Sequence, residues 1–234
     1  MGYIRQRFRA LFQKVEVDKP VTGKINTILG NVGNGKNTYA VAVARWISKR
    51  CKHGINLEKE CWLCNKWKVE NRKVKISANF MIDIPEVDCT FMKLPRDFFA
   101  IRRLRQHQLW IIDEPDAWGF DSRHRGPIND AIGRKIKQCR HYDADTLLIN
   151  QLNSMIDLRG RRLSSDTFYA ISPDALGFRY GLLKPDYSIP IRIPFKYAKE
   201  KIFPYYDTST IIGEEEETQG INRGEPNNNK EVMI

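Results

Sequence analysis

The chain has 234 residues, enough for one ordinary domain with a full core and a small insertion. Its net charge is +11, and the charge is uneven, since the residues from Gly213 onward include six acids and two bases while residues 1–212 carry +15. No apolar run approaches the roughly 20 residues that span a bilayer, and no signal-peptide core follows Met1. We therefore expect a protein kept inside a cell.

The basic body and the acidic tail predict a polyanionic partner, nucleic acid before anionic membrane. A generally basic soluble protein is the alternative. The five cysteines are an odd number, which favours a reducing compartment over a disulfide scaffold.

Residues 1–19 predict a basic amphipathic helix. Apolar residues recur at helical spacing, and basic residues lie elsewhere on the cylinder (Ile4, Phe8, Leu11, Phe12 and Val15; Arg5, Arg7, Arg9 and Lys14). Three roles stay open: peripheral contact with a membrane, contact with DNA, and packing on the body or on a neighbouring subunit. A linker with Pro20 leads into the body, which we expect over residues 20–212.

The next stretch has the pattern of a phosphate-binding P-loop, Gly30-Asn31-Val32-Gly33-Asn34-Gly35-Lys36-Asn37-Thr38. Residues 25–29 predict a buried strand before it, and residues 39–50 predict a helix after it, which is the context that a P-loop requires. Glycines let successive N–H groups point at phosphate oxygens, the helix N-terminus adds partial positive charge, and Lys36 adds a full one. An ordinary glycine-rich turn is the alternative.

Asn37 occupies the position where a P-loop carries Ser or Thr, whose hydroxyl ligates Mg²⁺. Either the amide oxygen of Asn37 ligates the metal, or a register shift brings in Thr38. Both readings weaken the prediction of hydrolysis.

Four residues that can ligate a metal follow within fourteen positions, two of them as C-x-x-C: Cys51, His53, Cys61 and Cys64. They predict a structural zinc site in a small insertion over residues 51–68, whose composition has little apolar content to fold by itself. Free thiols in a loop are the alternative.

Residues 74–80 alternate like a strand, and residues 95–106 predict a helix. Residues 109–112 then predict a buried parallel strand that delivers Asp113 and Glu114 at its C-terminal edge, where ligands bind in open α/β sheets. In a P-loop protein this is the Walker B element: Asp113 holds Mg²⁺ through its water shell, and Glu114 polarises the attacking water. The alternative is an ordinary buried strand that ends in acidic residues without a catalytic role.

Residues 127–140 predict a helix, and residues 146–151 predict another buried strand that ends in amides, among them Gln151. Amides at this edge are suited to sensing a γ-phosphate by donating a hydrogen bond. The candidates for an arginine finger are Arg134, Arg140 and Arg159. The alternative is that they are ordinary solvated surface residues.

Short β-like runs follow over residues 167–171, 179–183, 189–195 and 202–206, and we expect them to extend one edge of the sheet as antiparallel strands. Turn chemistry is expected at Tyr180-Gly181 and Lys184-Pro185-Asp186. Residues 213–234 predict an acidic, disordered tail.

Taken together, G-x-x-G-x-G-K, Ala78-Asn79, I-I-D-E and R-H-Y-D-A-D-x-L-L-I-N-Q resemble the Zot-domain ATPases of filamentous phages. More broadly, they are similar to the FtsK–HerA superfamily of viral genome-packaging and DNA-pumping ATPases. The resemblance covers roughly residues 24–210 and includes Met155-Ile156-Asp157-Leu158-Arg159 and Tyr205-Tyr206-Asp207-Thr208.

The resemblance implies an α/β fold with an ASCE-type P-loop core, a mainly parallel sheet flanked by helices, Mg²⁺ and ATP, and a ring oligomer, commonly a hexamer. By position, Lys36 matches the phosphate-binding lysine and Asp113 and Glu114 the Walker B pair. Gln151 matches the glutamine sensor and Arg140 an arginine near the subunit interface. The chain departs from the pattern at Asn37, at Asn150 where Thr is usual, and in lacking a transmembrane segment after the core.

The leading prediction is an ATPase that moves double-stranded DNA, as a viral genome-packaging motor in the host cytoplasm or on the virion, with capsid or assembly proteins as partners. One alternative is a virion-extrusion ATPase at a membrane, anchored by the basic helix. The other is a nucleotide-binding, non-hydrolysing switch or DNA-binding scaffold, which Asn37 motivates.

Overall fold

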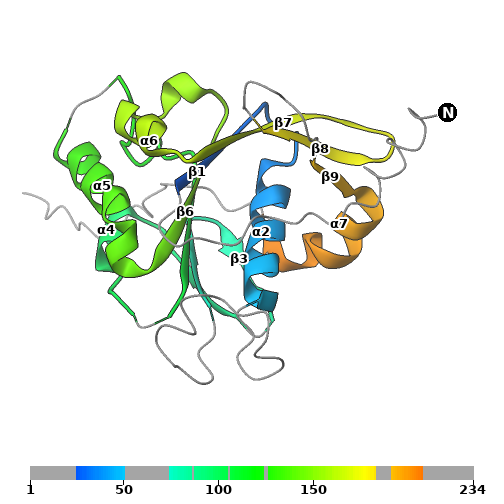
Figure 1. Cartoon of the computed structure of the whole chain (residues 1–234), viewed down its shortest axis with the longest axis horizontal. Helices are drawn as coiled ribbons and strands as arrows, with labels where there is room; N and C mark the ends of the chain where they lie inside the picture. Colours follow the sequence, from blue (N-terminus) through cyan, green and yellow to red (C-terminus); the bar gives the residue numbers. More distant parts are fainter. Residues whose placement is uncertain are drawn as a thin grey trace, which may run out of the picture.

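The computed structural model describes residues 25–50, 74–182 apart from 86, 105, 124 and 125, and 191–207. Figure 1 shows them as one α/β body around a twisted central sheet. The predicted N-terminal helix (1–19), the Cys/His insertion (51–68) and the acidic tail (213–234) lie outside the described residues.

The sheet has eight strands in the order β4-β2-β5-β6-β1-β7-β8-β9. From β4 to β7 neighbouring strands pair in parallel, and β8 and β9 add to the edge in antiparallel fashion. The strands are β1 (Ile25–Leu29), β2 (Lys75–Ala78), β4 (Asp88–Phe91), β5 (Gln108–Asp113), β6 (Ala144–Asn150), β7 (Asp166–Asp174), β8 (Gly177–Leu182) and β9 (Ile191–Pro194). A separate pair joins β3 (Met81–Ile82) to β10 (Tyr206–Asp207).

Strand β6 lies between β1, which leads into the P-loop, and β5, which carries the Walker B residues. In register, Leu29 lies opposite Asn150 and Asp113 lies opposite Ile149, so the ends of these strands meet at one edge of the sheet. The predicted α/β fold, with a mainly parallel sheet and antiparallel edge strands near the C-terminus, is confirmed.

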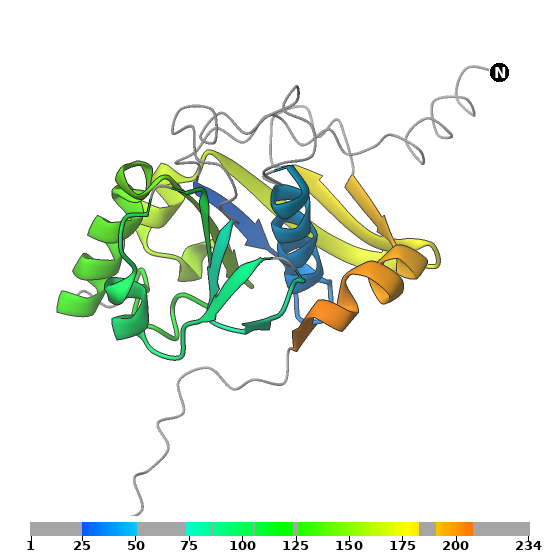
Figure 2. The same ribbon diagram turned by 90° about the horizontal axis from the view of Figure 1, so that it is seen from below.

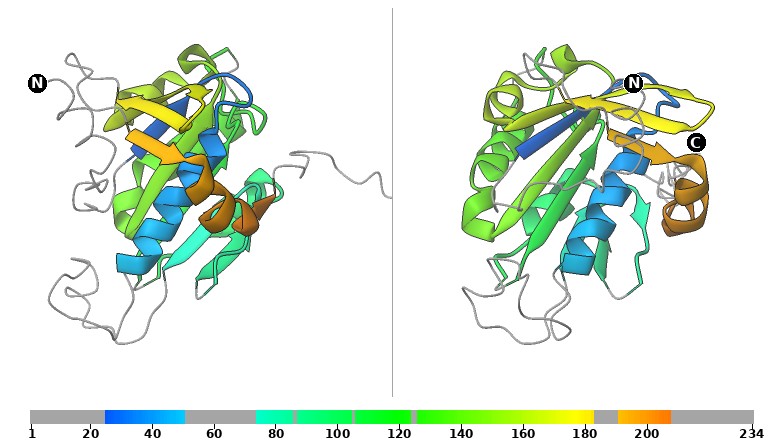
Figure 3. Two further views of the ribbon diagram at one scale, coloured as in Figure 1. Left: turned by 90° about the vertical axis from the view of Figure 1, so that its right-hand side faces the viewer. Right: turned by 45° about the vertical axis from the view of Figure 1, so that its right-hand side comes forward.

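Helices cover both faces of the sheet, as Figure 2 shows from below. Helices α2 (Lys36–Arg50) and α7 (Phe195–Lys201) pack on one face, and α4 (Pro95–Ala100), α5 (Pro127–Lys137) and α6 (Leu158–Leu163) lie on the other. In Figure 3 α7 lies beside α2, and the Arg45 guanidinium of α2 donates to the carbonyl of Lys201. None of the described helices is long and apolar enough to cross a membrane.

The central strands are buried on both faces, which is why they read as nearly continuous apolar runs. In β5, Leu109 and Ile111 pack into the core under α2, while Trp110 and Ile112 pack into the core under α4 and α5. The same alternation places Ile149 under α2. Asp113 and Asn150 stand at the C-terminal ends of β5 and β6, where the candidate site lies.

The helix predicted over residues 95–106 is wrong in length, because α4 ends at Ala100. The Nζ of Lys135 donates to the carbonyls of Phe99 and Ile101, at 2.9 Å in each case. A lysine 34 to 36 residues further along the chain therefore satisfies carbonyls that a longer helix would have used. Periodicity within the segment carries no sign of this contact.

The C-terminal predictions need three corrections. First, β7 pairs in parallel with β1, so the antiparallel extension begins only at β8. Second, Tyr180-Gly181 is no turn but lies inside β8, where Tyr180 is fully buried. The turn before β8 forms instead around Asp174, whose Oδ1 accepts from the backbone N–H of Leu176 at 2.9 Å and of Gly177 at 3.2 Å.

The third correction concerns the last two runs. The strand expected over residues 189–195 stops at Pro194, and the helix α7 follows it, which was not predicted. The strand expected over residues 202–206 is a 3₁₀ turn (Phe203–Tyr205) followed by the short β10. Pro204 explains this difference, because proline has no N–H to donate to a ladder. Lys184-Pro185-Asp186 lies outside the described ranges.

Candidate functional site

The loop between β1 and α2 curls through glycines in backbone conformations that other residues rarely adopt. Gly33 and Gly35 have φ of +81° and +80°. A Cβ on Gly35 would lie 2.4 Å from Cδ1 of Phe178, and one on Gly30 would lie 2.6 Å from the Ala170 carbonyl oxygen. Glycine is therefore required twice over at Gly35, for its dihedral angle and for its space.

Strands β7 and β8 support this loop from outside. The Tyr180 hydroxyl donates to the Gly35 carbonyl at 2.7 Å, and Nδ2 of Asn34 donates to the Ala170 carbonyl at 3.0 Å. Burial raises the pKa of Tyr180 far above its ordinary value, so this hydroxyl stays protonated and remains a donor. Tyr39 packs on Tyr180 with ring centroids 4.7 Å apart. The loop is thus shaped by neighbours as well as by its own sequence.

Lys36 is the first residue of α2, and its side chain folds back across the loop. Its Nζ donates to the carbonyls of Gly30 at 2.9 Å and Asn31 at 3.2 Å. Burial lowers the pKa of Lys36, while the charges of Asp113 and Glu114 act in the opposite direction. The ammonium is therefore held in the mouth of the loop by weak neutral acceptors that a phosphate oxygen can replace.

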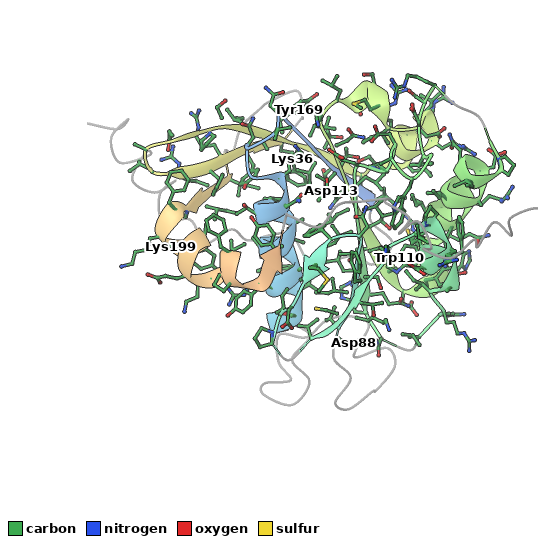
Figure 4. All side chains as sticks on the ribbon, turned by 180° about the vertical axis from the view of Figure 1, so that it is seen from behind. Lys36, Asp88, Trp110, Asp113, Tyr169 and Lys199 are labelled. Atoms are coloured by element: carbon green, nitrogen blue, oxygen red, sulfur yellow. The ribbon has the colours of Figure 1, made fainter. Side chains whose placement is uncertain are left out.

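Asp113, the last residue of β5, lies beside Lys36, as Figure 4 shows from behind. Its Oδ2 accepts from Nδ2 of Asn37 at 2.8 Å. Burial raises the pKa of Asp113 to about 6, against the hydrogen bond from Asn37 and the charge of Lys36. The carboxylate is therefore costly to hold ionised unless a cation joins it.

Asn79 fixes the backbone of Asp113, a role that sequence reasoning missed. This side chain is buried; its Nδ2 donates to the Asp113 carbonyl and its Oδ1 accepts from the Asp113 N–H, both at 2.7 Å. The amide continues the pairing of β2 with β5 after β2 has ended at Ala78. A polar residue directly after a buried strand was the available signal.

Glu114 follows Asp113 with φ of +47°, a left-handed conformation that is strained for a residue with a Cβ. Its N–H donates to the Ile149 carbonyl at 2.9 Å, and its Oε1 accepts from Nε2 of Gln151 at 3.4 Å. The structure therefore brings Glu114 and Gln151 together across the ends of β5 and β6. Backbone strain of this kind concentrates at functional sites.

Asn150 is fully buried and holds the two loops that follow β5 and β6. Its Nδ2 donates to Oδ1 of Asp116 at 2.7 Å, and its Oδ1 accepts from the Gln151 N–H at 2.6 Å. The Gln151 carbonyl in turn accepts from the Gly30 N–H at 3.4 Å. Asn150 thus positions Gln151, and both its amide nitrogen and its amide oxygen are bonded within the protein.

The amide of Asn37 fits a role as magnesium ligand. Its Nδ2 faces Asp113, while its Oδ1 is buried and has no hydrogen-bond partner. A buried amide oxygen without a partner is costly, and amide and carboxylate oxygens are ligands that Mg²⁺ accepts. Thr38, the residue of the alternative register, has its hydroxyl 3.0 Å from that of Tyr206 and is buried. Of the two residues, Asn37 has the oxygen to offer.

Metal clusters built from protein side chains alone are a separate question. Within the described ranges, no group of three or more His, Cys, Asp or Glu side chains is placed to hold a metal ion. A P-loop magnesium needs fewer protein ligands, because phosphate and water supply the others. The predicted zinc ligands Cys51, His53, Cys61 and Cys64 lie outside the described residues.

The three arginine-finger candidates differ in their surroundings. Arg159 is engaged within its own chain: its guanidinium donates to Asp157 at 2.8 Å and to Asp130 at 2.7 Å. Arg134 and Arg140 are exposed, and both precede β6, whose C-terminal end carries Gln151. Arg140 therefore lies near the N-terminal ends of the central strands, whereas the P-loop of the same chain lies at their C-terminal ends. The structure does not bring Arg140 to this site.

No protein-family model and no curated protein matches this chain. Among solved structures, it is similar to the N-terminal domain of zonular occludens toxin from Neisseria meningitidis, with 16% identity and a TM-score of 0.49 over 80% of this chain and 100% of that one. It is also similar to the genome packaging NTPase B204 from Sulfolobus turreted icosahedral virus 2, with 11% identity and a TM-score of 0.46 over 74% of this chain and 98% of that one.

A KaiC-like protein from Pyrococcus horikoshii OT3 is similar as well, with 9% identity and a TM-score of 0.40 over 74% of this chain and 83% of that one. All three TM-scores are below 0.5, so the strand order and the loop after β1 carry the fold assignment. By these features, the chain has the fold of a P-loop NTPase.

Proposed function

We propose that this chain is an ATPase that binds ATP and Mg²⁺ at the ends of β1, β5 and β6 and uses hydrolysis to move double-stranded DNA. The observation that carries the proposal is the pair Asn37–Asp113 beside Lys36, with an unpartnered oxygen on Asn37. This pair reproduces what a P-loop hydroxyl does: it donates to the Walker B carboxylate and keeps a lone pair for the metal. Asn37 therefore stands as a working replacement for Ser or Thr.

Each residue then has a defined task. The backbone N–H groups of residues 30–38 cradle the phosphates, and Lys36 leaves the carbonyls of Gly30 and Asn31 to bind a phosphate oxygen. Asn37 and Asp113 hold Mg²⁺, which when bound neutralises phosphate charge. Glu114 orients the attacking water.

Gln151 couples the catalytic carboxylate to the γ-phosphate. Its Nε2 donates to Glu114 in this structure, 3.4 Å away, so an arriving phosphate would compete for the same donor. Release of Gln151 would leave Glu114 able to accept from water. This exchange links the presence of the γ-phosphate to the orientation of Glu114, the catalytic base.

Arg140 completes the site from a neighbouring subunit in the proposed assembly. It is exposed at the far edge of the sheet, so it serves a P-loop only across a subunit boundary. We therefore propose a ring of copies, a hexamer, with residues 20–212 as the motor domain. The resemblance to the FtsK–HerA superfamily supports viral genome packaging as the process and capsid or assembly proteins as further partners.

A nucleotide-binding switch without hydrolysis is the second candidate, and Asn37 favours it. The amide is bulkier than the Ser or Thr hydroxyl that a P-loop carries at this position. In that case ATP binding would change the contacts of Gln151 without phosphate release.

Steady-state ATPase activity with and without double-stranded DNA separates the two candidates. We expect turnover that DNA stimulates and that Lys36→Ala abolishes, with Lys199→Ala, a charge-matched change on the exposed side of α7, behaving like the wild type. Tight ATP binding with no phosphate release, with or without DNA, would overturn the translocase and favour the switch.

A further inference from the structure

A hollow of about 720 Å³ lies at the other end of the sheet from the P-loop. One wall is residues 99–103, which lead toward β5, and the other wall includes Gln138, His141 and Tyr142, which lead into β6. Both walls therefore precede the strands whose C-terminal ends carry Asp113 and Gln151. We call this feature the basic hollow, after the residues that line it.

Two buried polar side chains hold the walls in place. Nε2 of Gln108 donates to the carbonyls of Arg102 at 3.3 Å and Tyr142 at 2.8 Å, which ties one wall to the other. Lys135 fixes the first wall through the carbonyls of Phe99 and Ile101. The first wall runs on from the end of α4, and the second is a short 3₁₀ helix (Cys139–Tyr142), so these bonds add to the shape that the backbone gives the hollow. The basic hollow is thus organised before any ligand arrives.

Lys135 also supports the hollow from below. Its ammonium lies 5.0 Å from the ring centroid of Tyr142, 5.2 Å from that of Phe98 and 5.8 Å from that of Trp110. Three rings around a cation, together with its two hydrogen bonds, keep this side chain in one position.

The lining is cationic and aromatic. Arg102, Arg103 and His141 line it together with the rings of Phe99 and Tyr142, and no acidic residue does. Arg102 and Arg103 are exposed, and none of the ion pairs in the described part of the chain involves them. Guanidinium groups that have no carboxylate partner are suited to bind phosphate.

We propose that the basic hollow binds an unpaired strand of nucleic acid, with phosphates on Arg102 and Arg103 and one base against the rings of Phe99 and Tyr142. Proteins that bind single strands combine such a cationic groove with aromatic stacking surfaces. A duplex keeps its bases stacked inside and presents only its convex backbone, so it does not fill a hollow with rings in it. The volume is within the range of roughly 300–1,000 Å³ that is typical of small-molecule sites.

This inference adds a strand-binding site to the proposed function and shares with it only nucleic acid as a partner. The basic hollow lies away from the P-loop, so strand binding here needs no ATP. Binding can therefore be measured without nucleotide, and on Lys36→Ala as well as on the wild type.

The test is fluorescence anisotropy of a labelled oligodeoxythymidine with the full chain, without nucleotide, over a range of NaCl concentrations. We expect Arg102→Ala/Arg103→Ala to lower the affinity at least tenfold. The slope of log K against log salt should fall by about 1.4, since each phosphate contact on a single strand contributes about 0.7. The charge-matched control Lys196→Ala/Lys199→Ala, on exposed positions of α7, should leave affinity and slope unchanged.

Phe99→Leu tests the stacking part separately. Phe99 is 38% exposed, and leucine keeps an apolar side chain there while removing the ring face. We expect about tenfold weaker binding with the salt slope unchanged, because stacking contributes roughly 1–3 kcal/mol per base. Thermal unfolding of each variant shows whether the fold is kept, and Gln108 and Lys135 stay untouched.

Three results would overturn the inference. Equal losses from the arginine pair and from the lysine pair would mean a diffuse basic surface. A matched duplex that competes as well as the single strand would remove the base contact. A glutamate-rich peptide whose binding depends on Arg102 and Arg103, while the oligonucleotide does not bind, would make the hollow a protein-docking site. Absence of ATPase activity would count against the proposed function only.

Discussion

The two ends of strands β5 and β6 differ in almost every physical respect. At their C-terminal ends stand carboxylates and amides that are largely buried and bonded to each other, such as Asp113, Asn150 and Gln151. At their N-terminal ends lie exposed arginines on a wall that Gln108 and Lys135 help to hold in shape. Five steps along β5 separate the ends, roughly 17 Å at 3.3–3.4 Å per residue. Strand direction thus keeps the P-loop and the Walker B residues apart from the exposed arginines of the basic hollow.

The largest expected effect is at the acidic end. Glu114→Gln keeps the size and hydrogen bonding of the side chain but removes its ability to accept a proton. Turnover should fall at least about 100-fold, the contribution typical of a positioned base, while ATP binding stays intact. Phosphate release and the binding of a fluorescent ATP analogue measure the two quantities separately. Near-normal turnover in this variant would mean that another group activates the water.

Next in size is the packing of the loop on β8. Gly33 and Gly35 have nearly the same φ, but a Cβ on Gly35 meets Phe178 at 2.4 Å, whereas one on Gly33 meets nothing within 4 Å. Gly33→Ala should cost roughly 1–3 kcal/mol for its dihedral angle, and Gly35→Ala should cost about 1–3 kcal/mol more for overpacking. Urea unfolding at equilibrium measures the difference. Equal costs for the two variants would mean that β8 gives way easily and does not shape the loop.

Asn37 offers a sharper test of the metal site. Asn37→Ser should keep the increase in ATP affinity that Mg²⁺ produces, because a hydroxyl can donate to Asp113 and still offer a lone pair. Asn37→Leu, close in size, should reduce that increase about tenfold and leave binding without Mg²⁺ nearly unchanged. Titration calorimetry with and without EDTA gives both affinities. A full Mg²⁺ effect in Asn37→Leu would remove Asn37 from the ligand set.

The smallest expected effect is at the basic end and depends on pH. Burial lowers the pKa of Lys135 from 10.5 to about 8. Between these values the unfolded chain binds more protons than the folded chain, so the stability that depends on this group rises with pH in that window and is flat below it. The difference in unfolding free energy between the wild type and Lys135→Met should therefore grow in favour of the wild type from pH 8 to pH 10.

Lys137→Met is the matched control, on the exposed face of the same helix. Its difference from the wild type should not change over this pH range. Chemical unfolding at each pH gives both differences, and contributions from the groups that the variants share with the wild type cancel. A constant difference for Lys135→Met would mean that its ammonium stays fully hydrated.

The same contrast explains what the sequence can predict. The P-loop, Asp113 and Glu114 are adjacent to buried strands, so local pattern and spacing were enough to place them at one edge of the sheet. The sequence shows that Asn37 departs from the P-loop pattern, but only the structure shows that its amide donates to Asp113. The basic hollow escaped prediction because Lys135 and Gln108 shape it from 34 to 36 and from 6 to 34 residues away.

Contacts between distant segments also decided the other differences. The direction of β7 depends on its pairing with β1, and the sequence of residues 167–171 does not indicate whether that pairing is parallel or antiparallel. Tyr180 resembled part of a turn beside Gly181, whereas its hydroxyl supports the Gly35 carbonyl 145 residues earlier. Asn79 was visible as a motif residue, yet its two hydrogen bonds to the backbone of Asp113 follow only from strand register.

The supports of the P-loop have a consequence for how the protein is made. Phe178 and Tyr180 contact Gly35, and Tyr206 bonds to Thr38, so the loop is completed by residues that leave the ribosome about 140 to 170 positions after it. A nascent chain that stops before Phe178 carries the whole glycine motif without the neighbours that shape it. Translation therefore completes these supports long after the glycine motif, and we expect a product truncated before Phe178 to bind nucleotide more weakly than the full chain.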